Sequence, residues 1–137
     1  MKAAEALPRI DPWRTLGYRS ESLEKYLRQD DPNLYRFSVC NSENLAGIVC
    51  IRSPWLMGPF IELLAIFPAF QGRGLGGEIV AWLEMEAQLT SKNIWTTVSS
   101  FNESAASFYR KRGFFPVGWL RDLIRPGFDE NLLRKVL

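Results

Sequence analysis

Residues 60–77 read FIELLAIFPAFQGRGLGG, and they join a buried strand to a helix through a glycine-rich loop. Residues 60–67 are apolar on both faces apart from Glu62, which is typical of a central strand that is covered on both sides. Four glycines follow within residues 71–77, although a glycine inside a helix costs about 1 kcal/mol relative to alanine. The sequence therefore places side-chain-free backbone at the first turn of the helix predicted over residues 75–89.

This glycine-rich loop has the composition of an anion-binding site. Successive backbone N–H groups at the start of a helix point toward one place, and the helix dipole adds positive potential there. Arg73 can add a charge-assisted hydrogen bond at the rim. A tight turn that binds no ligand is the alternative interpretation. A nucleotide P-loop is excluded because no Gly-Lys-Ser/Thr sequence follows, and the glycine spacing fits a dinucleotide-binding loop poorly.

The segments after the loop carry the periodicity of helices and strands. They are helices at residues 75–89 and 102–112 and strands at residues 93–100, 114–120 and 128–136. Gly113 stands where a left-handed C-terminal cap requires it. A single crossover helix between two strands makes those strands parallel, so residues 60–67 and 93–100 are predicted to form a parallel pair.

The segments before the loop predict a helix and a β-hairpin. Residues 20–28 have helical spacing with Ser20 as the cap, and residues 34–40 and 45–52 read as two strands joined by a turn. Residues 53–59 are marked by proline and glycine as a connection. Because a hairpin precedes the parallel pair, the sheet is predicted to be mixed and the fold class to be α/β.

Composition predicts one soluble domain over residues 1–137, which is 47% hydrophobic with a formal net charge of +2. This charge is too small to indicate nucleic-acid binding, and no segment is suited to spanning a membrane. The absence of histidine excludes Ser-His and Cys-His nucleophile pairs and the usual zinc sites, so no metal is expected. Cys40 and Cys50 are in position for a cross-strand contact, but we expect reduced thiols and a cytoplasmic protein.

A second motif lies at residues 102–114, which read NESAASFYRKRGF. Together with the pattern Gln71-x-x-Gly74-x-Gly76, it resembles the two signature motifs of the GNAT superfamily of acetyl-CoA-dependent N-acyltransferases. The resemblance is close over residues 60–114 and looser over the preceding hairpin. It implies a small N-acetyltransferase domain with acetyl-CoA as cosubstrate and a primary amine on a small molecule or peptide as acceptor. It also implies an α/β (α+β) fold with a mixed, mostly antiparallel sheet flanked by helices, in which the two central parallel strands splay apart at the cofactor.

The resemblance assigns roles to particular residues. Main-chain groups in residues 64–66 would pair with the pantetheine arm, the loop amides would hold the diphosphate, and the Asn102 side chain would bond the pantetheine. Tyr109 would direct its hydroxyl at the thioester sulfur, as a catalytic residue. The cofactor-binding residues implied are Leu64, Ala65, Ile66, Gln71, Gly72, Arg73, Gly74, Leu75, Gly76, Gly77, Asn102 and Tyr109.

Structural alternatives stay open for these residues. Asn102 is also a suitable helix cap, and Tyr109 also fits as a half-buried aromatic side chain. Residues 110–112 read as a solvated face, where cations suit the C-terminus of a helix.

Glu62 is the best candidate for the general base, because it is the one ionisable group of an apolar strand, where burial raises a carboxyl pKa. The alternatives are an ion pair between Glu62 and an arginine, and a chain of water molecules. Some members of the superfamily carry the base at the positions matched here by Thr97 or Phe60, and this sequence departs from both.

The acceptor pocket is expected between the early helix, the 53–59 connection and the last hairpin. Its candidate residues are Trp13, Trp55, Met57, Trp119 and Phe128, with Asp122, Asp129 or Glu130 to attract a cation. A non-catalytic module that senses acyl-CoA is the alternative function. No strand is evident before Trp13, and the open sheet edge that this would leave predicts a homodimer.

Overall fold

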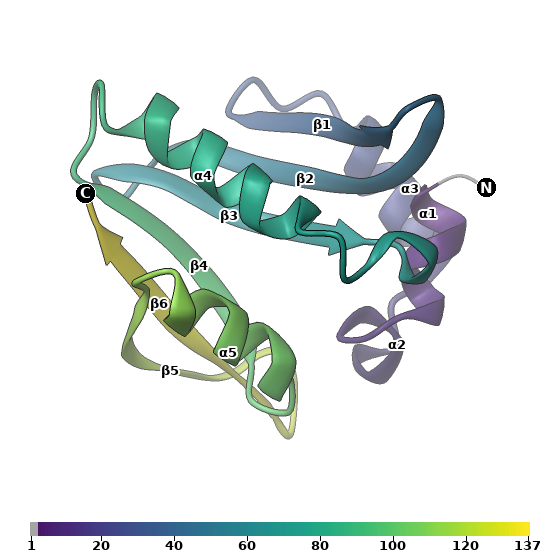
Figure 1. The fold of residues 1–137 in the computed structure, drawn as a ribbon. Coiled ribbons are helices and arrows are strands. Elements are labelled where there is room, and N and C mark those ends of the chain that lie inside the picture. The colour runs from purple at the N-terminus through teal and green to yellow at the C-terminus, as the bar shows by residue number, and fades with distance from the viewer. Residues whose placement is uncertain (1–2) are drawn as a thin grey trace.

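The computed structural model describes residues 3–137, whose strands form one sheet in the order β1-β2-β3-β4-β6-β5 (Figure 1). The strands are β1 (Leu34–Asn41), β2 (Asn44–Trp55), β3 (Gly58–Ile66), β4 (Asn93–Ser99), β5 (Phe115–Arg125) and β6 (Phe128–Val136). The helices are α1 (Ala3–Ala6), α2 (Trp13–Leu16), α3 (Ser20–Arg28), α4 (Leu75–Ala87) and α5 (Glu103–Lys111), with 3-10 turns η1 (Leu7–Arg9) and η2 (Pro68–Phe70). Only β3 and β4 are parallel neighbours among these strands. The predicted α/β class with a mixed, mostly antiparallel sheet is confirmed.

Helices cover both faces of the sheet, and each face has its own apolar core (Figure 1). Val80 and Leu83 of α4 pack with Tyr109 of α5 against the β2, β3, β4 and β6 side chains of one face. Leu7 of η1 and Leu23 of α3 are almost fully buried against the other face. The strand at residues 60–67 was expected to be covered on both sides, and β3 is.

A β-bulge at Glu62 changes the course of β3. Cys50 of β2 lies opposite Leu63, whereas the next residue, Ile51, lies opposite Ile61, so Glu62 is the extra residue on β3. The bulge reverses the alternation of side chains: Ile61 faces α4 and α5, and Leu63 faces α1 and α3.

The parallel pairing of β3 with β4 ends at this bulge. It consists of Phe60 opposite Trp95 and Ile61 opposite Thr96, and the Thr96 hydroxyl donates to the Ile61 carbonyl at 3.1 Å. Beyond this point the two strands diverge (Figure 1). The splayed parallel pair that the resemblance implied is therefore present, and it leaves one edge of β3 without a neighbouring strand.

Two local predictions were wrong. Residues 53–59 are mostly strand, because β2 continues to Trp55 and β3 starts at Gly58; Trp55 stacks on Phe60 with ring centroids 4.8 Å apart. Ser20 does not cap α3. The extended residue before the helix is Arg19, so Ser20 is already helical and its side chain forms no capping hydrogen bond.

The two cysteines are free thiols and are not cross-strand neighbours. Cys40 is exposed and lies opposite Leu45, whereas Cys50 is buried and lies opposite Arg36. A register shift between Val39 and Cys40 moves Cys40 one residue further from Cys50 along the hairpin.

The described chain before β1 is helical or irregular, and β1 is an edge strand of the sheet. Within residues 3–137, no helix has both the length and the apolar character needed to cross a membrane.

Candidate active site

The glycine-rich loop takes a conformation that only glycine adopts easily. Gly72 and Gly74 have φ values of +78° and +82°, and Gly74 is the N-cap residue of α4. A Cβ atom added at either position meets nothing within 4 Å, so the backbone conformation and not packing requires glycine there. The first amides of α4 therefore open onto a hollow of about 300 Å³, as expected for an anion site.

Helix α5 forms the other wall of this hollow. A Cβ atom at Gly76 would lie 3.1 Å from the Phe108 ring, and one at Gly77 would lie 2.6 Å from Nη2 of Arg112. Glycine at these two positions therefore allows α5 to approach the start of α4. The hollow is lined by Ile66, Phe70, Gln71, Gly72, Gly74, Leu75, Gly76, Gly77, Phe108 and Arg112.

Arg112 was predicted to lie on a solvated face, and the structure corrects this. Its guanidinium lies 3.8 Å from the centroid of the Phe108 ring, and Nη1 donates to the Phe108 carbonyl at 3.0 Å. Because the Arg112 side chain turns back over Phe108, its guanidinium lies beside the N-terminus of α4. Arg73, which was predicted to supply that charge, lies with its guanidinium 5.4 Å from the Phe70 ring.

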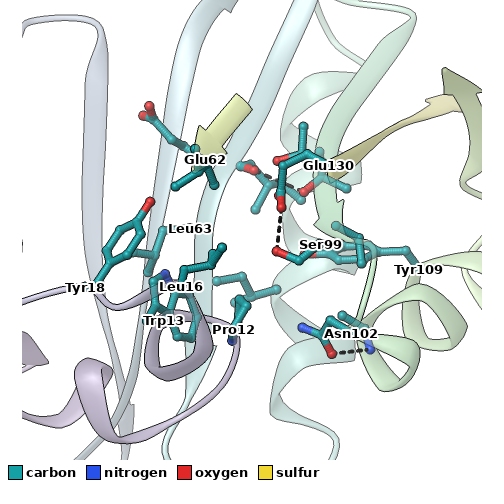
Figure 2. Close-up of a pocket in the computed structure, with 17 residues that line it drawn as sticks. Pro12, Trp13, Leu16, Tyr18, Glu62, Leu63, Ser99, Asn102, Tyr109 and Glu130 are labelled. Carbon is teal, nitrogen blue, oxygen red and sulfur yellow. Dashed lines mark hydrogen bonds between the residues drawn. The ribbon is translucent and has the colours of Figure 1, made fainter. Parts of the chain in front are cut away.

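A second cavity fills the gap between the splayed strands (Figure 2). Its volume is about 110 Å³, and it is bounded by β3, β4, α5, β5, β6 and the segment around α2. Four of the predicted site residues line it: Glu62, Leu64, Asn102 and Tyr109. Ile66 lines the loop hollow instead, and its carbonyl accepts a hydrogen bond from Nε2 of Gln71 at 2.9 Å. Strand β3 thus joins the two cavities.

Asn102 caps α5 from a position on the cavity wall. Its Oδ1 accepts hydrogen bonds from the backbone N–H of Ala105 and the Ser104 hydroxyl, each at 3.2 Å. The capping alternative is therefore observed, and it occupies the carbonyl end of the side-chain amide.

Tyr109 reaches the same cavity from within the core. It is only 6% exposed and makes edge-to-face contacts with Phe108 and Phe114 at centroid distances of 5.0 and 5.1 Å. Desolvation raises the pKa of its hydroxyl to about 12, with an opposing effect from Thr96. The hydroxyl is therefore protonated at neutral pH and can donate a hydrogen bond into the cavity.

Glu62 forms the ion pair that was left open as its alternative role. Its carboxylate lies 3.0 Å from Nη2 of Arg52, and Nη1 of Arg52 lies 2.9 Å from Asp31. Arg52 therefore bridges two carboxylates, and of these three residues only Glu62 lines the cavity.

Glu130 is a carboxylate that sequence reasoning treated only as one of three acids able to attract a cation. It is 3% exposed, and its Oε2 accepts a hydrogen bond from the Ser99 hydroxyl at 2.5 Å (Figure 2). Burial raises the pKa of this carboxyl, while hydrogen bonds from Ser99 and Thr97 oppose the rise. Among the lining residues in the described part of the chain, none is basic.

Of the predicted acceptor residues, only Trp13 and Glu130 line this cavity. Met57 and Trp119 are exposed, and Trp55 packs at the opposite end of the parallel pair, where it contacts Phe60 and Trp95. Their place in the wall is taken by Pro12, Leu16, Tyr18 and Ile124.

A family model described as the acetyltransferase (GNAT) family matches residues 3–114. The chain belongs to this family. The match ends before β5 and β6, so Glu130 lies outside it.

Known proteins share sequence and fold with this GNAT chain. The SPbeta prophage-derived uncharacterized N-acetyltransferase YokL of Bacillus subtilis (strain 168) is 29% identical in an alignment of 118 positions that covers 81% of this chain and 63% of the relative. The chain thus spans less than two thirds of that relative's length. A GNAT acetyltransferase from Elizabethkingia anophelis with acetyl-CoA bound has the same fold, with a TM-score of 0.75, 17% identity and coverage of 100% and 92% of the two chains. The ribosomal-protein-S18-alanine N-acetyltransferase from Escherichia coli gives a TM-score of 0.69 at 17% identity over 87% and 77%.

Proposed function

We propose that this GNAT chain transfers the acetyl group of acetyl-CoA to a primary amine by direct attack. The observation that carries the proposal is the arrangement along β3, where the loop hollow at Ile66 leads to the cavity that contains Tyr109. The Elizabethkingia anophelis structure, which has this fold, holds acetyl-CoA.

The proposed path of acetyl-CoA follows the free edge of β3. The amides of residues 72–77 hold the diphosphate, and the backbone of residues 64–66 pairs with the pantetheine arm as an added strand would. The side-chain nitrogen of Asn102 donates to the arm, because its oxygen is used by the helix cap. Gln71 must release the Ile66 carbonyl if that oxygen pairs with the arm.

In the proposed reaction the amine nitrogen attacks the thioester carbonyl carbon, and a C–N bond forms. The tetrahedral intermediate then re-forms its C=O bond, and the C–S bond breaks with its electron pair on sulfur. Full proton transfer from a phenol with a pKa of about 12 to a thiolate whose acid has a pKa near 8.5 is uphill by about 5 kcal/mol. Tyr109 therefore acts by donating a hydrogen bond to the developing thiolate.

Arg112 is expected to contribute to the affinity for acetyl-CoA. Replacement of Arg112 by glutamine removes the cation beside the first turn of α4 and should weaken binding about fivefold, or about 1 kcal/mol. The loss should shrink as salt concentration rises, because salt screens exposed charges. Calorimetric titration at two salt concentrations measures both effects. An unchanged affinity at low salt removes Arg112 from the diphosphate site.

The second candidate function is a module that binds acyl-CoA without turnover. It is favoured by the Arg52–Glu62 ion pair, because that pair neutralises the predicted base. Acetyl-CoA consumption with polyamines, amino acids, aminoglycosides and peptide amines distinguishes the two functions. Turnover with any of these amines supports the enzyme, and binding without turnover on all of them supports the sensor.

The cavity also indicates a class of acceptor. Arg52 compensates the charge of Glu62, but Glu130 has no basic partner among the residues that line the cavity in the described chain, so an ammonium group is attracted there and a neighbouring carboxylate is repelled. We therefore propose an alkylamine or peptide amine over a free α-amino acid. Homodimer formation at the exposed edge of β1 and a cytoplasmic location remain predictions; the mass in solution across a concentration series tests the dimer.

A further inference from the structure

We infer that Glu130 is the general base that takes a proton from the ammonium group of the acceptor. This inference rests on the proposed acetyl transfer and assigns one of its residues. The observation behind it is that Glu130, Ser99 and Tyr109 meet at one cavity although they lie on β6, β4 and α5 (Figure 2).

The position of Glu130 follows from the pairing of β4 with β6. Ser99 lies directly opposite Glu130 in the antiparallel register, and its hydroxyl donates to Oε2 at 2.5 Å. Ser99 thereby holds one carboxylate oxygen. A carboxylate has about four lone-pair positions, so beside the hydroxyls of Ser99 and Thr97 it can still accept a hydrogen bond from an ammonium group in the cavity. Tyr109, proposed to act on the leaving sulfur, lines the same space from α5.

Glu62 and Glu130 differ in how their charges are compensated. Glu62 pairs with Arg52 at 3.0 Å, and its side chain is 28% exposed. Glu130 is 3% exposed and its partners are the neutral hydroxyls of Ser99 and Thr97; no basic residue of the described chain lines the cavity beside it. An arriving ammonium is thus the cation that this carboxylate lacks, whereas Glu62 already has one.

The proton balance of the reaction is complete with this assignment. The ammonium transfers one proton to the Glu130 carboxylate, and the neutral amine attacks the thioester. When the C–S bond breaks, the nitrogen loses its second proton and the coenzyme A thiolate gains one, so that the products are an amide and a thiol. The Glu130 carboxyl then releases its proton to solvent. The net reaction converts an ammonium and a thioester into an amide, a thiol and one proton.

The environment of Glu130 sets the direction of its pH response. Burial raises its pKa, and the hydroxyls of Ser99 and Thr97 on β4 oppose this rise. The other titratable groups that line the cavity are Tyr18 before α3, Glu62 on β3 and Tyr109 on α5. A base must be ionised, so activity falls as pH falls through the pKa of Glu130. In a plot of kcat against pH, the fall on the acidic side (the acidic limb) should therefore occur at a pH above the usual pKa range of a carboxyl group.

The Glu130→Gln variant tests the assignment. It should lower kcat at least tenfold, remove the acidic limb of the pH profile and leave acetyl-CoA affinity within about twofold of the wild type. Because a raised pKa means that ionisation of Glu130 costs stability in the folded state, the neutral amide should keep or raise the midpoint of urea unfolding above that pKa. Glu43→Gln, in the exposed turn between β1 and β2, is the matched control and should change none of these values.

The Ser99→Ala variant is a second, independent test. Ser99 is a positioning residue, and loss of its hydrogen bond should move the acidic limb to higher pH, because this bond lowers the pKa of Glu130. A purely structural role for Ser99 would lower stability without moving the limb.

The outcomes separate this inference from the proposed function. If wild-type protein acetylates an amine while Glu130→Gln keeps both kcat and the acidic limb, Glu130 is not the base and the proposed function stands. A variant that loses kcat but also unfolds at much lower urea, together with an unmoved limb in Ser99→Ala, likewise overturns the inference. If wild-type protein binds acetyl-CoA but acetylates no amine, the proposed function itself fails.

Discussion

Replacement of Gly74 by aspartate is expected to lower acetyl-CoA affinity at least about a hundredfold, or about 2.8 kcal/mol. Gly74 caps α4 at a φ of +82° with no atoms near an added Cβ, and aspartate tolerates this conformation better than most residues. The new carboxylate lies beside the first amides of α4, which are the groups proposed to bind the diphosphate. It also places a negative charge where the diphosphate is proposed to bind, which costs about 4 kcal/mol per charge pair at 4 Å in a medium of intermediate polarity.

The matched control for this change is Gly74→Asn. Asparagine has the same shape and the same tolerance of a positive φ but no charge, so it should weaken binding much less than aspartate. Calorimetric titration of both variants, with urea unfolding to show that each is folded, separates repulsion from steric effects. Equal affinities for the two variants would mean that no anion binds at the start of α4.

Replacement of Tyr109 by phenylalanine is expected to lower kcat at least tenfold, or about 1.4 kcal/mol of transition-state stabilisation, with little change in acetyl-CoA affinity. The hydroxyl is proposed to meet charge that develops on sulfur only as the C–S bond breaks. The ring contacts with Phe108 and Phe114 remain in the variant, so stability should change little.

Steady-state kinetics give kcat for Tyr109→Phe, and titration with acetyl-CoA gives its affinity. The control is Tyr35→Phe, which changes an exposed side chain on β1. Unchanged turnover in Tyr109→Phe would leave Tyr109 as a core residue only. If acetyl-CoA affinity fell as much as kcat, the Tyr109 hydroxyl would contribute to binding and not to the chemical step.

Most of the fold was predictable because it depends on local periodicity. The apolar run of residues 60–67, the glycines at the start of α4 and Gly113 after α5 fix their elements through contacts near in sequence. The Ser20 cap was wrong by one residue at a helix boundary, whereas the other differences came from tertiary contacts. Trp55 continues β2 because it stacks on Phe60 across the turn, and the bulge at Glu62 exists only in the register between β2 and β3.

The candidate site was predictable only where motifs lie at or beside it. The glycine loop, Asn102 and Tyr109, all of which belong to the two motifs, line the two cavities. The position of Glu130 could not be predicted, because its partner Ser99 lies far away in the sequence. Only the register between β4 and β6 brings the two residues together. Arg112 likewise gains its position when α5 packs against the start of α4, a contact that no helical periodicity contains.

Calorimetric titration of the chain with acetyl-CoA tests whether the bare amides at the start of α4 bind the diphosphate. We expect saturable heat with a stoichiometry of about one, which is lost in Gly74→Asp but not in Gly74→Asn. The absence of binding heat from folded wild-type protein across temperatures, or equal binding by wild type and Gly74→Asp, would contradict it.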